Sequence, residues 1–467
     1  MAILRILLLV VVTTSSAWAG CTISKDVKGT STVVFTLSPT PTEVINQLGM
    51  SNMLSPVALI DKLQSYSDTA NSLMKTVTDK MKALNPFGSL LPIPECRYYW
   101  ISNQLFCDNV NSAIIAPICG MFTTITNVTN PISLPLPQLD SIPLTCENDL
   151  DGRPWGLEKI QAPETWALGY NGTGVVVANI DTGVRYTHVE LRDNMRPFFN
   201  WFDPYNFSTN VPSDTNGHGS HTMGTMVGKN VGVAPGATWI ACRGCGTASC
   251  DNEQLLACGQ FLSCPDNKTQ SCSTRPDVIN NSWGGGIGNT FYLGVLSVWK
   301  AMGISFFFSS GNSGPACSTV MSPADSNYTK YGHLSVGSTA CNDKIASYSS
   351  TGPSQAADYM AGLGVQIVVP GSNVRSAWNT SDTAYNTISG TSMASPHSTG
   401  AGAVILSKNK ALTPEQVYAA MMSTAYRDPA ITNSAAYCTS SSADLSGYPN
   451  NVYGYGRVNL LEAVKVV

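Results

Sequence analysis

The second half of the chain contains short apolar runs in which hydrophobic residues do not alternate with polar ones. Four such runs are "GVVVANI" (174–180), "TWIAC" (238–242), "GISFFF" (303–308) and "QIVVP" (366–370). A strand exposed on one face alternates apolar and polar residues, whereas a strand buried on both faces need not. The runs therefore predict strands of a parallel sheet that is covered on both sides.

Helical segments are predicted between and after these runs, at about residues 218–228, 252–262, 290–302, 392–408 and 413–424. Alternation of strands and helices is typical of an α/β fold with right-handed crossovers. Because ligands in such folds bind at the carboxyl ends of the strands, polar residues that follow an apolar run are the first candidates for chemistry.

Residues 20 to about 150 have a different pattern. The predicted elements are strands at 31–37, 96–107 and 121–129, a helix at 40–49 and a long amphipathic region at 56–84. Cys96 and Cys107 could join the two strands of a hairpin. Prolines then recur at positions 131, 135, 137 and 143, which favours an extended tether. We therefore expect a small α+β unit followed by a linker.

The start of the chain reads as a secretory signal peptide at residues 1–19. Arg5 precedes the apolar run "ILLLVVV" (6–12), and Ala17-Trp18-Ala19 supplies an A-x-A cleavage site before Gly20. The run is too short to span a bilayer. A buried N-terminal strand is the alternative, and the A-x-A site disfavours it. No later stretch reaches 18 apolar residues, so we expect a soluble, secreted protein without a membrane anchor.

Composition narrows the functional classes. The chain has 467 residues, 43% of them hydrophobic and only 12% charged, with a formal net charge of −4. This length suggests two to four domains of ~150 residues, and this composition is that of a folded protein. Nucleic-acid binding would require clustered Lys and Arg, so no nucleic-acid partner is expected. We expect a monomer.

Fourteen cysteines in a secreted chain predict disulfides. Five precede residue 150, and six of the other nine crowd together at positions 242, 245, 250, 258, 264 and 272. Cys242-x-x-Cys245 could instead bind zinc. Disulfides are the better prediction, because these six cysteines include no second C-x-x-C and have no histidine nearby.

Sequons for N-glycosylation add to the extracellular interpretation if the host is eukaryotic. They occur at Asn127, Asn171, Asn206, Asn267, Asn327 and Asn379. Asn280 also begins a sequon, but it ends an apolar, strand-like run, so we expect it to carry no glycan.

Two polar residues stand where an α/β site would form. Asp181 follows the run at 174–180, although Asp-Thr-Gly is also good turn chemistry. His218 lies between two glycines at a predicted helix start, where tight backbone turns leave an imidazole accessible. His221 could form a metal pair with it, but i,i+3 spacing without a nearby acidic ligand is a weak signal.

The stretch "ISGTSMASPHSTG" (388–400) contains six hydroxyl side chains and one histidine. Proline is tolerated only near a helix start, so Pro396 implies that a helix begins near Ser392. The free N–H groups there would favour an oxyanion. His397 comes five residues later, on another side of the helix, so it is predicted to be structural.

Asn312 follows the run at 303–308 and could donate a side-chain N–H to an oxyanion, although a turn asparagine before Gly314-Pro315 is the plain alternative. Each residue is ambiguous alone. The chain order Asp, His, Ser with an amide donor between the last two is that of the subtilisin triad.

The segments "VANIDTGV", "NGHGSHTMGT" and "SGTSMASPH" closely resemble the three catalytic motifs of subtilisin-like serine proteases. "NNSWGG" and "SSGNSGP" are similar to the family's substrate-binding and oxyanion segments. The resemblance covers about residues 150–465, and details such as "WGLEKIQAPETWALGYNGTG" are most similar to the bacillopeptidase F branch. It implies a subtilisin-like three-layer α/β fold with a mostly parallel central sheet at residues 147–467.

The resemblance also implies the roles of the site residues. Ser392 would be the nucleophile, His218 the general base and then acid, and Asp181 the residue that orients the imidazole. Asn312 and the Ser392 N–H would form the oxyanion hole. The walls of the primary specificity pocket would come from Ser282, Trp283, Gly284, Ser310 and Gly311. No cofactor is required, no metal ligand is predicted, and structural calcium is a family property without an assignable loop here. "SPHSTG" and the cysteine-rich insertion at 242–272 depart from the family pattern.

The N-terminal region at 20–146 resembles the inhibitory propeptide of such enzymes, with the stretch from about 51 to 95 as an insertion. Counting Cys146 with the later part gives even numbers of cysteines, four and ten, which predicts autocleavage between Cys119 and Cys146. We therefore expect a secreted endopeptidase made as a zymogen, with its propeptide as intramolecular inhibitor and proteins or peptides as substrates. A catalytically silent binding protein and a peptide ligase on the same triad are the alternatives.

Overall fold

The computed structural model describes residues 21–49, 55–84, 92–136, 152–206, 209–360, 362–427, 438 and 447–467. The predicted signal peptide and Cys146 lie outside these residues. The chain forms two compact units. One comprises the residues up to Thr40 together with Ser65–Pro131, and the other comprises Pro41–Gln64 together with Ile132–Val467.

In its described residues, the smaller unit has a five-stranded sheet and two α-helices. The strand order is β1-β5-β2-β4-β3, and the elements are β1 (Thr22–Ile23), β2 (Thr30–Leu37), β3 (Cys96–Tyr99), β4 (Gln104–Asn111), β5 (Ile125–Thr129), α3 (Ser67–Leu84) and α4 (Ile115–Met121). Cys96 lies opposite Cys107 in the β3–β4 pair and is bonded to it, as the hairpin predicted. The strand expected from residue 121 begins only at Ile125, because α4 continues to Met121.

The larger unit contains a seven-stranded sheet that is parallel throughout, in the order β14-β13-β12-β11-β7-β9-β8. The strands are β7 (Val176–Asp181), β8 (Trp201–Phe202), β9 (Thr238–Arg243), β11 (Val278–Asn281), β12 (Ser305–Ser309), β13 (Leu334–Thr339) and β14 (Ile367–Pro370). All four apolar runs contribute a strand, so the predicted α/β class is confirmed.

The run "FFF" in β12 shows why these strands lack alternation. Phe306 packs edge-on against Trp299 of α9 (Leu293–Ala301), whereas Phe307 packs against Tyr418 of α12 (Pro414–Ser423). Successive side chains of a strand point to opposite faces, and here both faces are covered by helices. Burying a phenylalanine side chain contributes roughly 1.5–3 kcal/mol, so the run is favourable at every position.

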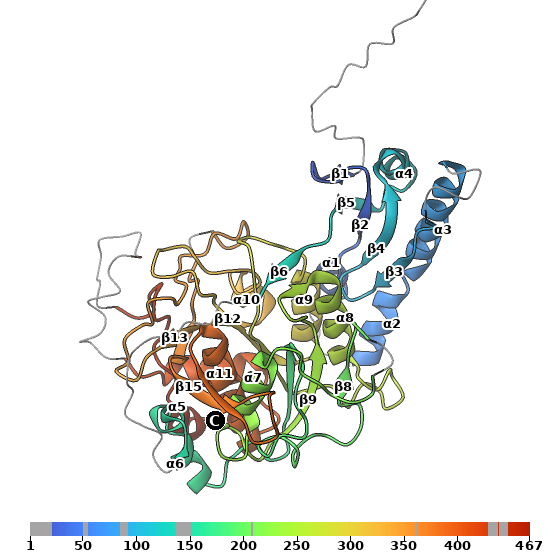
Figure 1. Cartoon of the computed structure of the whole chain (residues 1–467). Helices are drawn as coiled ribbons and strands as arrows, with labels where there is room; N and C mark the ends of the chain where they lie inside the picture. The colour runs from blue at the N-terminus through green and yellow to red at the C-terminus, as the bar shows by residue number, and fades with distance from the viewer. Residues whose placement is uncertain are drawn as a thin grey trace, which may run out of the picture. The chain divides into compact units, whose positions relative to one another are not determined.

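Two helices that pack against each other cover the sheet near β7 and β11 (Figure 1). They are α7 (His218–Val227) and α11 (Thr391–Lys408). Helix α11 is buried on all sides as far as Leu406, which explains why its sequence of small and hydroxyl residues has no polar face. It begins at Thr391, one residue from the predicted start, and Pro396 lies in its second turn.

The remaining elements lie around this sheet. They are α1 (Pro41–Gln47), α2 (Pro56–Gln64), β6 (Ser133–Pro135), α5 (Trp155–Lys159), α6 (Ala162–Ala167), β10 (Ser249–Asp251), α8 (Asn252–Ser263), α10 (Tyr328–Tyr331), the β15 (Val374–Ala377) and β16 (Tyr385–Ile388) hairpin, and α14 (Leu460–Lys465). Among the described residues, no helix is both long and apolar enough to cross a bilayer.

The cysteines of the cysteine-rich insertion form disulfides, which excludes the alternative that Cys242 and Cys245 bind zinc as thiolates. Cys242 is bonded to Cys258 and Cys245 to Cys250, so the C-x-x-C pair provides no thiolates. The further bonds are Cys21–Cys119, Cys264–Cys272 and Cys317–Cys438, and Cys341 is also disulfide-bonded. The one described cluster of potential metal ligands, Cys264, Asp266 and Cys272, includes that disulfide and therefore lacks thiolate ligands too.

Candidate active site

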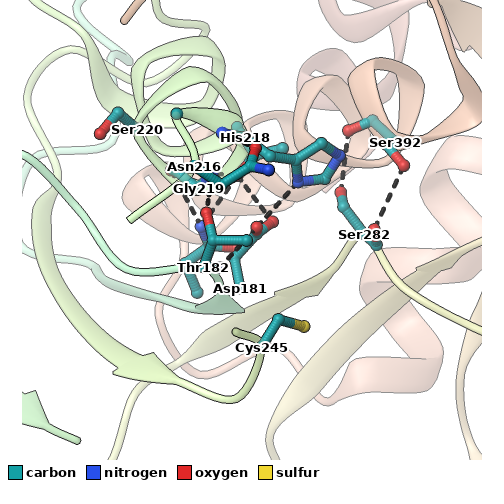
Figure 2. Close-up of polar contacts among 12 residues, drawn as sticks. Asp181, Thr182, Asn216, His218, Gly219, Ser220, Cys245, Ser282 and Ser392 are labelled. Carbon is teal, nitrogen blue, oxygen red and sulfur yellow. Dashed lines mark hydrogen bonds and ion pairs between the residues drawn. The ribbon is translucent and has the colours of Figure 1, made fainter. Parts of the chain in front are cut away.

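Three elements bring the predicted triad together (Figure 2). Asp181 is the last residue of β7, His218 is the first residue of α7, and Ser392 is the second residue of α11. The Nδ1 atom of His218 lies 2.7 Å from Oδ1 of Asp181, and both side chains are almost fully buried. The structure thus brings the three predicted residues together at the carboxyl end of β7.

Asp181 is held by hydrogen bonds in addition to the one from His218. The backbone N–H of Thr182 donates to Oδ1 at 2.7 Å, and the hydroxyl of Thr222 lies 3.1 Å from Oδ2. Donors on a carboxylate favour its charged form and fix its orientation. These hydrogen bonds fix the orientation of the Asp181 side chain toward His218.

Asp214 organises the backbone that precedes and begins α7. Its Oδ1 accepts from the N–H groups of Asn216 and Gly217 and from the hydroxyl of Thr182, while its Oδ2 accepts from the N–H and hydroxyl of Ser220. A carboxylate at a helix N-terminus satisfies donors that have no partner within the helix. The sequence analysis missed this residue, although an Asp four positions before a helical histidine was a usable signal.

Gly217 is required directly before His218. Its φ is +111°, and a Cβ there would lie 2.6 Å from the ring of Trp378. An L-residue with a side chain would be strained by this conformation and would also clash. The glycine flank that made His218 a candidate is therefore explained by close packing as well as by the turn.

The pKa of His218 reflects two opposing effects. Burial of the imidazole disfavours its charged form and by itself lowers the pKa. The charge and hydrogen bond of Asp181, together with the charge of Asp214, outweigh burial, so the pKa of His218 is raised above its ordinary value. A base of raised pKa beside an oriented carboxylate is suited to accept a proton.

The imidazole of His218 lies between Asp181 and Ser392 (Figure 2). Its Nε2 atom is buried and has no hydrogen-bond partner among the described residues. The hydroxyl of Ser392 donates to the backbone oxygen of Ser282 at 3.2 Å, and Ser282 in turn donates through Oγ to the backbone oxygen of Ser392 at 2.8 Å. Nucleophile and base therefore face each other with a hydroxyl that can rotate toward the base.

Asn312 lies beside the start of α11. Its Oδ1 accepts from the backbone N–H and the hydroxyl of Thr391, at 2.9 and 2.8 Å. A Cβ placed on Gly390 would stand 3.3 Å from Nδ2 of Asn312 and 3.6 Å from the backbone nitrogen of Ser392. Both predicted oxyanion donors thus border the same small volume, which the absence of a side chain at position 390 leaves open.

The residues predicted to wall the specificity pocket are closely packed. A Cβ on Gly284 would meet the backbone oxygen of Ser322 at 2.9 Å, and one on Gly311 would meet Cγ of Met321 at 2.9 Å, so neither position tolerates a side chain. Ser310 is fully buried beside Gly311. The side chain of Trp283 packs in the core against Tyr292 and Phe308, so only its backbone can form a wall.

The other candidate histidines are structural. His221 is buried, its Nε2 lies 3.0 Å from the backbone oxygen of Val374, and burial lowers its pKa to about 3. His397, as predicted, points away from Ser392; its Nδ1 contacts the backbone oxygen of Met393 at 2.8 Å, and burial lowers its pKa to about 4. Burial therefore keeps both rings uncharged.

Strand β6, which precedes the seven-stranded sheet in the sequence, pairs with β10. Strand β6 runs antiparallel to β10, with Leu134 opposite Cys250, and the N–H of Leu136 donates to the oxygen of Ala248 at 2.9 Å. A Cβ on Gly285 would lie 2.9 Å from the side chain of Leu134. An extended segment of the chain therefore lies between β10 and the segment that follows β11.

The chain is similar to several known proteins. A model of the Subtilase family matches residues 172–456. Bacillopeptidase F of Bacillus subtilis is 34% identical over 348 residues, which is 68% of this chain and 22% of that protein. Subtilisin DY of Bacillus licheniformis is 32% identical over 280 residues, or 58% of this chain and 91% of that protein. The extracellular serine proteinase of Thermus sp. is 33% identical over 279 residues, or 57% of this chain and 60% of that protein.

Proposed function

Because the chain belongs to the subtilase family, we propose that it is a secreted serine endopeptidase that hydrolyses peptide bonds through Asp181, His218 and Ser392. One observation carries the proposal. The imidazole of His218 is bonded to Asp181 through Nδ1 and presents a buried, unpartnered Nε2 toward Ser392. This is the arrangement that a base requires to activate a hydroxyl.

The proposed reaction follows from these contacts. The Ser392 hydroxyl turns from Ser282 to His218, which takes its proton as Oγ attacks the substrate carbonyl. The developing oxyanion accepts hydrogen bonds from the Ser392 N–H and from Asn312. His218 then protonates the leaving amine, and water enters by the same route to hydrolyse the acyl-enzyme. Losing a side-chain donor of the oxyanion-hole type costs about 2.7–4 kcal/mol in subtilisin, the worked case for this effect.

We also propose that the protein is made as a zymogen whose propeptide lies within residues 20–146 and is released by cleavage between Cys119 and Cys146. The β6–β10 pairing supports this, because an extended segment of the same chain takes the position that an added substrate strand would need. The chain continues from Leu136 into the interval before Cys146, where we place the cleavage. The signal peptide, and glycans at exposed sequons such as Asn206 and Asn267, belong to the same secretory hypothesis.

Labelling with a fluorophosphonate tests the enzyme proposal. We expect the processed wild-type protein to take the label and Ser392→Ala to take none, because the probe reacts only with an activated serine. Ser398→Ala is a matched control, since it removes another buried hydroxyl of α11. Absence of label on processed wild-type protein would favour a silent binding protein instead.

A further inference from the structure

Two buried asparagines lie directly opposite each other on neighbouring strands beneath the triad. Asn179 of β7 pairs with Asn280 of β11, and both side chains are fully buried. Nδ2 of Asn280 donates to Oδ1 of Asn179 at 3.0 Å. Uncharged polar side chains at such positions are unfavourable unless their hydrogen bonds are satisfied. Their partners therefore indicate what the pair does.

From Asn179 the hydrogen bonds lead to the catalytic carboxylate. Its Nδ2 lies 2.9 Å from the hydroxyl of Thr222, which is also fully buried. Thr222 has one proton and two possible acceptors at 3.1 Å, Oδ2 of Asp181 and the backbone oxygen of Gly219. A charged acceptor gives the stronger hydrogen bond, so we assign the Thr222 hydroxyl as a donor to Oδ2 of Asp181.

From Asn280 the hydrogen bonds lead to the helix of the nucleophile. Its Oδ1 accepts from the hydroxyl of Ser395 at 2.8 Å, and its Nδ2 also donates to Ser282 at 3.0 Å. Ser282 then donates to the backbone oxygen of Ser392 at 2.8 Å. The second amide hydrogen of Asn179 donates to the backbone oxygen of Gly219 at 3.3 Å, so each side-chain amide hydrogen and oxygen of the two asparagines has a partner.

We propose that Asn179 and Asn280 form a buried bridge that sets Asp181 and Ser392 relative to each other, and that Asn179 acts on the reaction as a positioning residue through Thr222. The bridge ties together β7, α7, β11 and α11, three of which carry one triad residue each. Hydrogen bonds in a connected series polarise one another. The last bond of the series, from the Thr222 hydroxyl to Asp181, is therefore stronger than an isolated hydroxyl–carboxylate bond. This inference rests on the proposed protease function.

Thr222→Val is the first test, because it removes the hydroxyl at nearly constant shape. With one hydrogen-bond donor fewer, the negative charge of the Asp181 carboxylate is less stabilised, so it stabilises the imidazolium form of His218 more strongly. The charged groups facing that ring are Asp181 and Asp214, and His221 faces it as a neutral ring. The acid limb is the acidic side of the plot of kcat/KM against pH, where activity falls as His218 becomes protonated. We expect this acid limb to move to higher pH and kcat to fall about threefold to tenfold, with KM unchanged.

Asn179→Val tests the route through Thr222. The Thr222 hydroxyl then loses its donor and its fixed orientation, so the acid limb should move in the same direction. The double variant Asn179→Val/Thr222→Val should shift the limb no further than Thr222→Val alone, because both changes remove the same bond. Additive shifts would overturn the assignment of Asn179 to this route.

Two matched variants separate positioning from packing. Thr222→Ser keeps the hydroxyl and should restore the acid limb. Thr225→Val removes another buried hydroxyl of α7, one that bonds only to the oxygen of His221, and should lower stability without moving the limb. Rates are taken per labelled serine, so partial misfolding does not enter the comparison.

The outcomes distinguish this inference from the proposed function. An unlabelled, inactive wild type would remove the protease proposal itself. An active wild type with Thr222→Val unchanged in kcat and acid limb would remove the bridge alone. Loss of thermal stability in Thr222→Val and Thr225→Val alike, with identical pH profiles, would show that the hydroxyls serve packing only.

Discussion

Asp214 acts on the site from a position next to the triad. Five donors from four residues converge on its carboxylate, which lies at the start of the helix that carries His218. Its charge also helps to raise the pKa of His218. One residue thus contributes both to the fold of the α7 N-terminus and to the proton affinity of the base.

The wild-type acid limb should therefore lie above the ordinary histidine value of about 6.5. Asp214→Asn removes the charge, so the pKa of His218 should fall and the acid limb should move to lower pH, opposite to Thr222→Val. Stability should drop by about 1–3 kcal/mol, because an amide cannot accept every one of these donors. A pH–rate profile and a denaturant titration measure the two effects. A wild-type profile that stays flat down to about pH 4 would contradict the role of His218 as the base.

The raised pKa of His218 also makes the stability of the folded protein depend on pH. A histidine whose pKa is raised on folding stabilises the native state most where it is protonated, below its unfolded value. That contribution is lost as the pH rises through the raised native value. His218→Gln should remove this pH dependence, which thermal unfolding between pH 5 and 9 would detect.

At the scale of elements, β10 is held in place by disulfides. Cys250 lies within β10 and is bonded to Cys245, five residues earlier, while Cys242 at β9 is bonded to Cys258 in α8. The strand that pairs with β6 is therefore fixed at its centre.

Replacing Cys245 and Cys250 by serine together should weaken substrate binding more than chemistry. Closing so short a loop contributes about 2 kcal/mol at most, so the protein should still fold. The N–H of Cys245, which donates to the backbone oxygen of Asp181 at 3.1 Å, survives the change. We expect KM for an extended peptide to rise severalfold with kcat nearly constant. The Cys264/Cys272 double serine variant is the control, and equal KM changes in both would argue against a role for β10.

The elements also show what sequence reasoning can and cannot reach. The positions of Asp181, His218 and Ser392 at a strand end and at two helix starts were predictable, because local patterns of glycine, proline and apolar residues show such ends. The Asn179–Asn280 bridge was not predicted, although a polar residue inside an apolar run was a signal for it. The β6–β10 pairing depends on a partner more than a hundred residues away along the chain, and no local pattern reports such a partner.

At the scale of the whole molecule, the disulfides bear on maturation. The four cysteines before residue 120 pair among themselves, and the described bonds after residue 240 also stay within that part. If cleavage occurs between Cys119 and Cys146, no described disulfide holds the two products together. The described disulfides therefore do not cross the interval in which cleavage is expected.

A denaturing gel without reductant tests this division. Processed protein should give two separate fragments, and N-terminal sequencing should place the larger one at or before Cys146. Fragments that separate only after reduction would mean that a bond crosses the cut. A larger fragment that begins after Cys146 would remove the parity argument.

If β6 occupies the position of a substrate strand, as proposed, its pairing with β10 has a kinetic consequence. A competitor within the same chain is present at an effective concentration on the order of millimolar, whatever the protein concentration. Dilution cannot activate such a molecule while the chain is intact. After the cut, the same strand becomes an ordinary bimolecular ligand whose occupancy falls on dilution. Secretion into a large volume would then complete the activation that cleavage begins.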